Sequence, residues 1–206
     1  MSDRAETADD GPFSDELERW LLSDEPKTLG AMNDVFAEKS FAVTIMLLMF
    51  VPALPLPTGG VTHVFEAITV LLAAQMVLGR RTIWLPARWN RRDLGATATT
   101  KTIPFIVRRV RQVERFSRPR GTRLFENRWS MRALGLLLMA FAVAAAVAPP
   151  FSGLDTLPAL GAVAIALSII LEDVVVLGIG LLLGTGGIVL ILTVGAALFR
   201  LLKGLF

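Results

Sequence analysis

Two long blocks that are almost free of charge dominate the pattern of this chain, residues 41–78 and residues 133–199. The acidic or basic side chains within them are Glu66, Asp155, Glu172 and Asp173. A soluble domain of this size would distribute its charges along every amphipathic element. The pattern therefore predicts an all-α integral membrane protein.

A proline- and glycine-broken apolar sequence occurs once in each block. The first copy spans residues 53–60 (ALPLPTGG) and the second spans residues 146–153 (AVAPPFSG). The copies align without a gap, so that Pro57 corresponds to Pro150. At membrane depth, irregular backbone survives only where it is buried in protein or lines a cavity. Such a pair of broken segments therefore indicates an internal repeat and a site in a transport-like membrane protein.

The predicted membrane helices are short. Residues 41–56, 61–78 and 133–148 would form helices of about 24 to 27 Å, less than the roughly 30 Å of a hydrocarbon core. Two arrangements fit these lengths. Each copy is either a thin helical hairpin with its Pro-Gly turn at the far interface, or a re-entrant hairpin whose turn stops inside the bilayer.

The remaining charges divide the chain into five regions and orient it. These are an acidic N-terminal region (1–39), a first hairpin (40–79), a basic connector (80–132), a second hairpin (133–173) and a C-terminal membrane segment (174–206). The connector has fifteen basic and three acidic residues, which makes it cytoplasmic by the positive-inside rule. We therefore expect a cytoplasmic N-terminus in a bacterial inner membrane, with both hairpins inserted from the same side.

The C-terminal segment leaves two alternatives. Residues 174–199 could cross the membrane once as a tilted helix of about 39 Å. Alternatively, the chain breaks at residues 184–187 (GTGG) into two short arms. We expect the break, because it returns Arg200 and Lys203 to the cytoplasmic side that the charge rule favours.

The cytoplasmic regions are expected to contain amphipathic helices. In residues 101–116 the apolar positions recur at helical spacing, with arginines largely on the other side. This helix either lies among anionic lipid headgroups, which we expect, or packs on the N-terminal helices. In the N-terminal region, Ser14 and Thr28 are the expected N-caps of helices over residues 15–22 and 29–38.

Several short motifs flank the two breaks. They are LPLPTGG at 54–60, LLAAQMVLGR at 71–80, WLP at 84–86, PPF at 149–151, LPAL at 157–160 and LED at 171–173. Together they resemble the exopolysaccharide synthesis protein ExoD family over roughly residues 28 to 200. The resemblance implies a bacterial inner-membrane protein linked to exopolysaccharide production, without an established catalytic chemistry. One departure is the placing of His63 and Glu66 where mostly apolar residues are expected.

The chemistry of catalysis is poorly represented. The chain has one histidine and no cysteine, whereas a metal site needs several such ligands. The glycine-rich residues 184–187 lack the Lys-Ser/Thr ending of a phosphate-binding loop, and Gly-x-Ser-x-Gly is absent. We therefore predict no catalytic residue, metal or cofactor. Nucleic acid is also a poor partner, because membrane segments bracket the basic connector on both sides.

Polar residues at membrane depth are the candidate ligand-binding positions. An ionisable side chain there is costly and by default indicates function. The candidates are Pro57, Gly59, Gly60, Thr62, His63, Glu66, Gln75, Arg80, Pro150, Gly153, Asp155 and Thr156. Structural alternatives stay open: a Glu66–His63 pair near the interface, an N-cap at Asp155 or Thr156, and a hydrogen bond from Gln75 between helices. The glycines are turn positions in any account.

Two functions remain. The first is a non-catalytic membrane component of exopolysaccharide synthesis or export, which binds lipid-linked or anionic intermediates. The alternative is a small transporter or lipid flippase with a site near Glu66 and Asp155. Because both copies enter from the cytoplasm, the repeats are parallel and not inverted, which favours the first. Expected partners are anionic lipid at the basic connector, polysaccharide-assembly proteins and further copies of this chain.

Overall fold

The computed structural model describes residues 12–24, 26–28, 30–31, 39–54, 61–80, 82–84, 95, 98–118, 120–149 and 152–205. Every regular element in this part of the chain is a helix, which confirms the all-α prediction. The elements are α1 (Phe13–Leu22), α3 (Ser40–Phe50), α4 (Val61–Val77), the π-helix η2 (Ala98–Thr102), α6 (Ile103–Glu114), α7 (Thr122–Glu126), α8 (Arg128–Val147), α9 (Thr156–Leu171) and α10 (Val174–Leu205).

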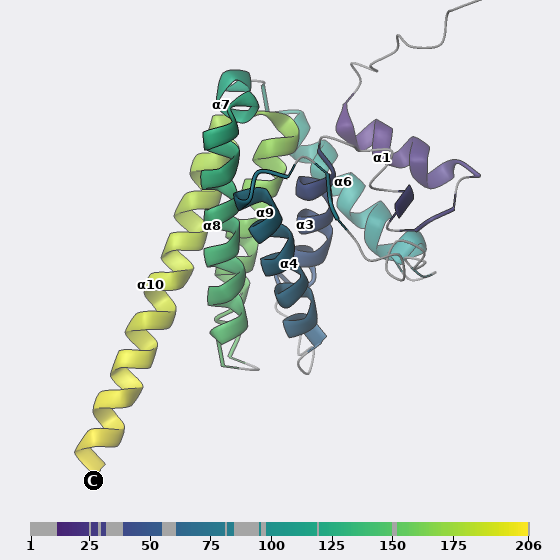
Figure 1. Ribbon diagram of the computed structural model, residues 1–206. Coiled ribbons are helices and arrows are strands. Elements are labelled where there is room, and N and C mark those ends of the chain that lie inside the picture. Colours follow the sequence, from purple (N-terminus) through teal and green to yellow (C-terminus); the bar gives the residue numbers. More distant parts are fainter. Residues whose placement is uncertain are drawn as a thin grey trace, which may run out of the picture.

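Four of these helices form a bundle. Helix α3 contacts α4 and α9, and α8 contacts the same two helices, so that α4 and α9 each lie between α3 and α8. Helix α10 runs along α9 and α8, while α1 and α6 lie beside the bundle (Figure 1). The apolar side chains that repeat on every turn meet in one core, in which Ile45, Leu138 and Ile165 are fully buried.

The lengths of the helices agree in part with the prediction of short spans. Helix α8 and residues Val174–Ala197 of α10 are long and apolar enough to cross a membrane, whereas α3, α4 and α9 are shorter apolar helices. Helix α8 begins at Arg128, earlier than expected. The first Pro-Gly turn, with Pro57, Gly59 and Gly60, lies outside the described residues, as does Pro150. The repeat and the re-entrant turns therefore stay predictions.

The expected break in the C-terminal segment is wrong. Helix α10 continues without interruption through residues 184–187 to Leu205. It begins near α7, and its C-terminal end projects past the opposite end of α8 (Figure 1). Arg200 and Lys203 therefore lie at the other end of α10 from Asp173, and do not return beside it.

The glycines of this segment serve helix packing instead of a turn. A Cβ atom on Gly184 would lie 2.0 Å from the Phe141 ring of α8, and one on Gly161 of α9 would lie 2.5 Å from the Gly184 Cα. A Cβ on Gly187 would lie 2.5 Å from Pro158. Helices α9 and α10 thus meet backbone to backbone, as small residues allow in membrane proteins. Apolar surroundings also favour an intact helix, because the continuous helix pairs its internal backbone N–H and C=O groups with one another.

Helix α6 buries its apolar face in the protein. Its buried residues are Ile103, Ile106, Val107 and Val110, four of the apolar positions that recur at helical spacing, whereas Phe116 beyond the end of the helix is exposed. Helix α1 contacts α6, and the rings of Phe50 and Phe105 meet edge to face at 5.7 Å. Of the two alternatives given for this helix, the structure therefore has the one in which it packs on the N-terminal region. Lipid contact by the basic face of α6 stays a prediction.

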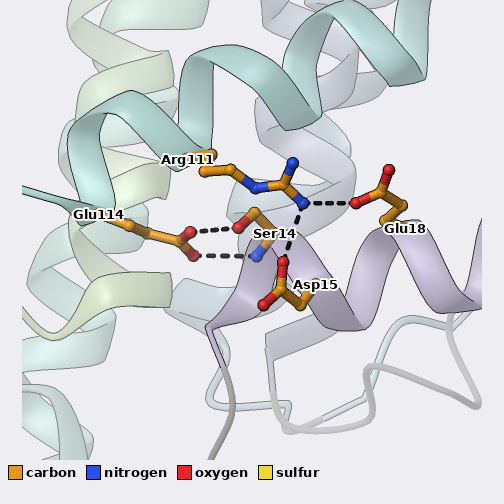
Figure 2. A network of polar contacts seen from close by, with 5 residues as sticks. All are labelled: Ser14, Asp15, Glu18, Arg111 and Glu114. Carbon is orange, nitrogen blue, oxygen red and sulfur yellow. Dashed lines mark hydrogen bonds and ion pairs between the residues drawn. The ribbon is translucent and has the colours of Figure 1, made fainter.

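Polar contacts fix α1 on α6 (Figure 2). The backbone N–H and the hydroxyl of Ser14 both donate to the Glu114 carboxylate, and Arg111 donates to Glu18 and to Asp15, the latter at 2.8 Å. Hydrogen bonding to Glu18, and then to Asp15, raises the pKa of Arg111 above its ordinary value. The N-cap predicted for Ser14 is wrong, because α1 begins at Phe13 and Ser14 contacts α6 instead.

Close packing at Gly184 predicts a position-specific effect in α10. We expect Gly184→Ala to lower stability by about 1–3 kcal/mol, because the added methyl group has to displace the Phe141 ring. Gly186→Ala is the matched control, since nothing lies within 4 Å of its added Cβ. Thermal melting of the purified protein in detergent measures both. Equal melting temperatures for the two variants would contradict the packing of α10 on α8 and α9.

Candidate functional site

A buried carboxylate lies on the first turns of α4, as the sequence indicated. The Glu66 side chain is fully buried, and its Oε2 lies 2.7 Å from Nδ1 of His63. The two residues are three positions apart in the helix, which places their side chains on neighbouring turns of one face. The His63 side chain is 38% exposed, so that the pair joins the interior of the bundle to its surface.

The second carboxylate oxygen of Glu66 is unpaired. Its Oε1 has no hydrogen-bond partner in the described part of the chain, and neither has the Thr69 hydroxyl one turn further along α4. Thr62 on the same face is also buried. Buried polar atoms are nearly always paired in folded proteins, so an unpaired carboxylate oxygen and an unpaired hydroxyl on successive turns of one helix are unusual. They leave this face of α4 able to receive a hydrogen-bond donor.

Asp155 brings the second hairpin to the same place. It immediately precedes α9 and lies within electrostatic range of Glu66. Asp155 occupies the N-cap position of α9, as one of the alternatives predicted, but its side chain makes no capping hydrogen bond. Thr156 is the first residue of α9. Gly153 has a φ of +69° in the turn before α9, as expected of a turn glycine. His63, Glu66 and Asp155 form what we call the acidic cluster.

Gln75 and Arg80 do not belong to the acidic cluster. They lie at the other end of α4, where the Gln75 Oε1 accepts from the Trp84 N–H at 2.8 Å and its Nε2 donates to the Trp84 carbonyl at 3.4 Å. Gln75 thus fixes the segment that follows its own helix. The hydrogen bond between helices predicted for Gln75 is therefore wrong.

Arg80 lines a cavity that the sequence did not reveal. The cavity measures about 360 Å³, and its charged lining residues are Lys39, Arg80, Glu126, Arg128 and Glu172. We call it the arginine cavity. It lies where α3 and α8 begin and where α4 and α9 end. In the sequence, the charged residues of the cavity are far apart. The feature that could have indicated a common site is that each lies near the end of an apolar helix.

A buried aspartate holds this end of the bundle together. Asp173 is 1% exposed. Its Oδ1 accepts from the Val175 N–H at the start of α10, at 2.8 Å. Its Oδ2 accepts from the Ser117 hydroxyl at 2.8 Å and from the Arg118 N–H at 3.0 Å. Burial acts to raise the pKa of Asp173, but the three hydrogen bonds and the charge of Arg120 together hold it below its ordinary value.

The geometry can be compared with known proteins. The family model described as "Exopolysaccharide synthesis, ExoD" matches residues 13–193 of this chain. The chain belongs to the ExoD family. Membership implies involvement in exopolysaccharide synthesis.

Two curated relatives match. An uncharacterized protein of Synechocystis is 23% identical over 173 residues, which cover 82% of this chain and 81% of the relative. Protein ExoD of Rhizobium meliloti is 30% identical over 150 residues, 71% of this chain and 61% of the relative. No solved structure matches.

Two of the six motifs that carry the ExoD resemblance reach the arginine cavity. The motif over residues 71–80 ends α4 and supplies Met76 and Arg80 to the wall, and the motif over residues 171–173 ends α9 and supplies Glu172. Glu172 adopts the left-handed conformation, with a φ of +53°, where a helix usually ends in glycine. The neighbouring Asp173 contacts hold this conformation in place, so that the Glu172 side chain faces the cavity.

Asp173 predicts a pH-dependent stability. The folded-state pKa is lower than the ordinary value, so the carboxylate stabilises the fold above about pH 4 and this contribution is lost as the pH falls through the lower folded-state pKa. We expect Asp173→Asn to lower the free energy of unfolding by roughly 2 kcal/mol at neutral pH, because hydrogen bonds to a buried charged group contribute about that much.

Thermal melting in detergent between pH 7 and pH 3 tests this expectation. The difference in melting temperature between the wild type and Asp173→Asn should be constant near neutral pH and should become smaller towards pH 3. Asp24→Asn, at an exposed site, is the control and should follow the wild type throughout. A difference that grows as the pH falls would contradict the assigned role.

Proposed function

We propose that this protein is a non-catalytic component of exopolysaccharide synthesis or export in the bacterial inner membrane, and that it binds lipid-linked intermediates. Family membership supports the process, and the two helices long enough to cross a membrane support the location. The acidic N-terminal region and the basic connector would face the cytoplasm, because of the charge rule. Polysaccharide-assembly proteins and further copies of the chain are the proposed partners.

The acidic cluster is the observation that carries the binding role. A fully buried carboxylate in an otherwise apolar helix is costly, and by default it indicates a functional site. The unpaired Glu66 Oε1 can accept a hydrogen bond, and the Thr69 hydroxyl can accept or donate one. Hydroxyl groups of a saccharide are donors of the kind that such acceptors bind. The position between the two hairpins allows Asp155 to contribute from the second side.

Glu66→Gln is expected to reduce polymer production several-fold when it replaces the wild type in a deletion strain. The amide keeps the size of the side chain but removes a charged acceptor, and such a bond contributes about 1.5–3 kcal/mol, or roughly tenfold or more in affinity. Polymer amount and chain length are the measurements, with protein levels checked by immunoblotting.

Val64→Ala is the matched control for this experiment, because Val64 lies two residues away on α4 with its side chain 56% exposed. This variant should restore normal polymer. A deletion strain that already makes polymer of normal amount and length would contradict the proposed function itself.

A small transporter or lipid flippase is the second candidate function. Glu66 belongs to the first hairpin and Asp155 to the second, which favours this candidate. If the hairpins moved relative to each other, the distance between the two carboxyl groups would change. A site shared between two moving units is the arrangement on which alternating access depends.

Transport predicts that Glu66→Gln abolishes flux of an anionic lipid in proteoliposomes while the protein remains folded. The variant lacks one of the two carboxyl groups whose distance would change when the hairpins move. Translocation of a fluorescent phospholipid, read by its accessibility to an impermeant quencher, measures the flux. Wild-type protein without flux across a panel of anionic lipids would contradict this candidate, and so would unchanged flux in the variant.

A further inference from the structure

The arginine cavity holds more positive charge than its carboxylates neutralise. Lys39 is occupied, because its Nζ lies 3.6 Å from the Glu172 Oε1 and donates to the Ile170 carbonyl at 3.1 Å. Arg80 and Arg128 make no ion pair with a carboxylate in the described part of the chain, and the Arg80 guanidinium lies 5.9 Å from the Trp84 ring centre. Glu126 is the one further charged group of the wall.

A half-buried arginine next to the cavity adds to its positive charge. Arg132 packs on Gly79, which lines the cavity, and its guanidinium lies 2.9–3.4 Å from where a Cβ of that glycine would be. The Nε of Arg132 is buried and has no hydrogen-bond partner among the residues described. A buried N–H donor of a charged group is costly to leave unpaired. The positive charge of Arg132 thus adds to that of Arg80 and Arg128, which line the cavity.

The remaining wall is apolar. It is formed by Phe41, Met76, Phe125, Met131 and Ile169, together with Ala42. The volume of about 360 Å³ falls within the range of small-molecule sites. A wall that combines cations with methionine and phenylalanine side chains fits a molecule with an anionic head and an apolar chain.

We propose that the arginine cavity binds the phosphate group of a phosphate-bearing lipid, with the start of its apolar chain against the apolar wall. Arginine forks match the oxygen atoms of phosphate, which offers more acceptors than a carboxylate. The cavity lies at the end of the apolar helices, beside Trp84 and Trp129, whose exposed rings are typical of the headgroup depth of a bilayer. This site adds to the acidic cluster and does not depend on it.

Native mass spectrometry of the full chain in dodecyl maltoside tests the site. The probe is dodecyl phosphate, and the detergent itself supplies the same chain without phosphate. We expect a dodecyl phosphate complex that Arg80→Gln and Arg128→Gln each weaken about tenfold, the effect of one lost charged hydrogen bond. Arg108→Gln, an equal change of charge at an exposed position of α6, should bind like the wild type.

Three outcomes would overturn the proposal. They are no dodecyl phosphate complex, inorganic phosphate that competes as strongly as dodecyl phosphate, and equal weakening by Arg108→Gln. Free phosphate would be the ligand in the second case, and attraction to the basic surface would explain the third. If a glutamine variant does not fold, Arg80→Lys and Arg128→Lys keep the charge but lose the fork, and they should bind more weakly than the wild type.

The assay separates this site from the proposed function. Binding of dodecyl phosphate is measured without cells, whereas exopolysaccharide synthesis is measured by polymer in the deletion strain. Absent binding together with Glu66-dependent polymer would overturn the arginine cavity as a lipid site and leave the proposed function standing. Normal polymer in the deletion strain would overturn the proposed function and leave the binding result unaffected.

Discussion

Burial of the Asp173 carboxylate is the constraint from which the charged end of the bundle follows. A carboxylate removed from water is costly unless it is fully hydrogen-bonded, and here three donors from two separate segments converge on it. One donor sets the first turn of α10, and the other two hold the segment after α6. The same residue fixes the reversal at Glu172, and with it one wall of the arginine cavity. A single side chain thus couples the helical core to the basic connector.

Local chemistry made part of this structure predictable. The charge-free blocks predicted the apolar helices, and the spacing of His63 and Glu66 predicted that they share a face. The partners of each helix were not predictable in this way. A glycine-rich run is typical of a turn, and only the approach of Phe141 and Gly161 to Gly184 shows that these glycines serve packing. The apolar stripe of α6 likewise fits lipid or protein equally well, and the position of α1 decides between them.

The arginine cavity was hidden for a related reason. Lys39, Arg80, Arg128 and Glu172 come from segments far apart in the sequence, and each alone is an ordinary charged residue at a helix end. Their convergence depends on the antiparallel course of the four helices, which brings two helix beginnings and two helix ends together. The acidic cluster at the other end of α4 uses the same geometry with the opposite sign of charge. One small bundle thereby presents an acidic end and a basic end.

The unequal lengths of the helices have a consequence for the surrounding lipid. Helix α10 contributes a span of 24 residues, about 36 Å, whereas α3 has 11 residues, about 17 Å. In a bilayer the exposed side of α10 would exceed the hydrocarbon thickness, while the short α3 is shielded by the helices around it. Tilt of α10 would relieve this excess, at a fraction of a kcal/mol per Å. The thickness of the surrounding bilayer would thereby set the tilt of α10.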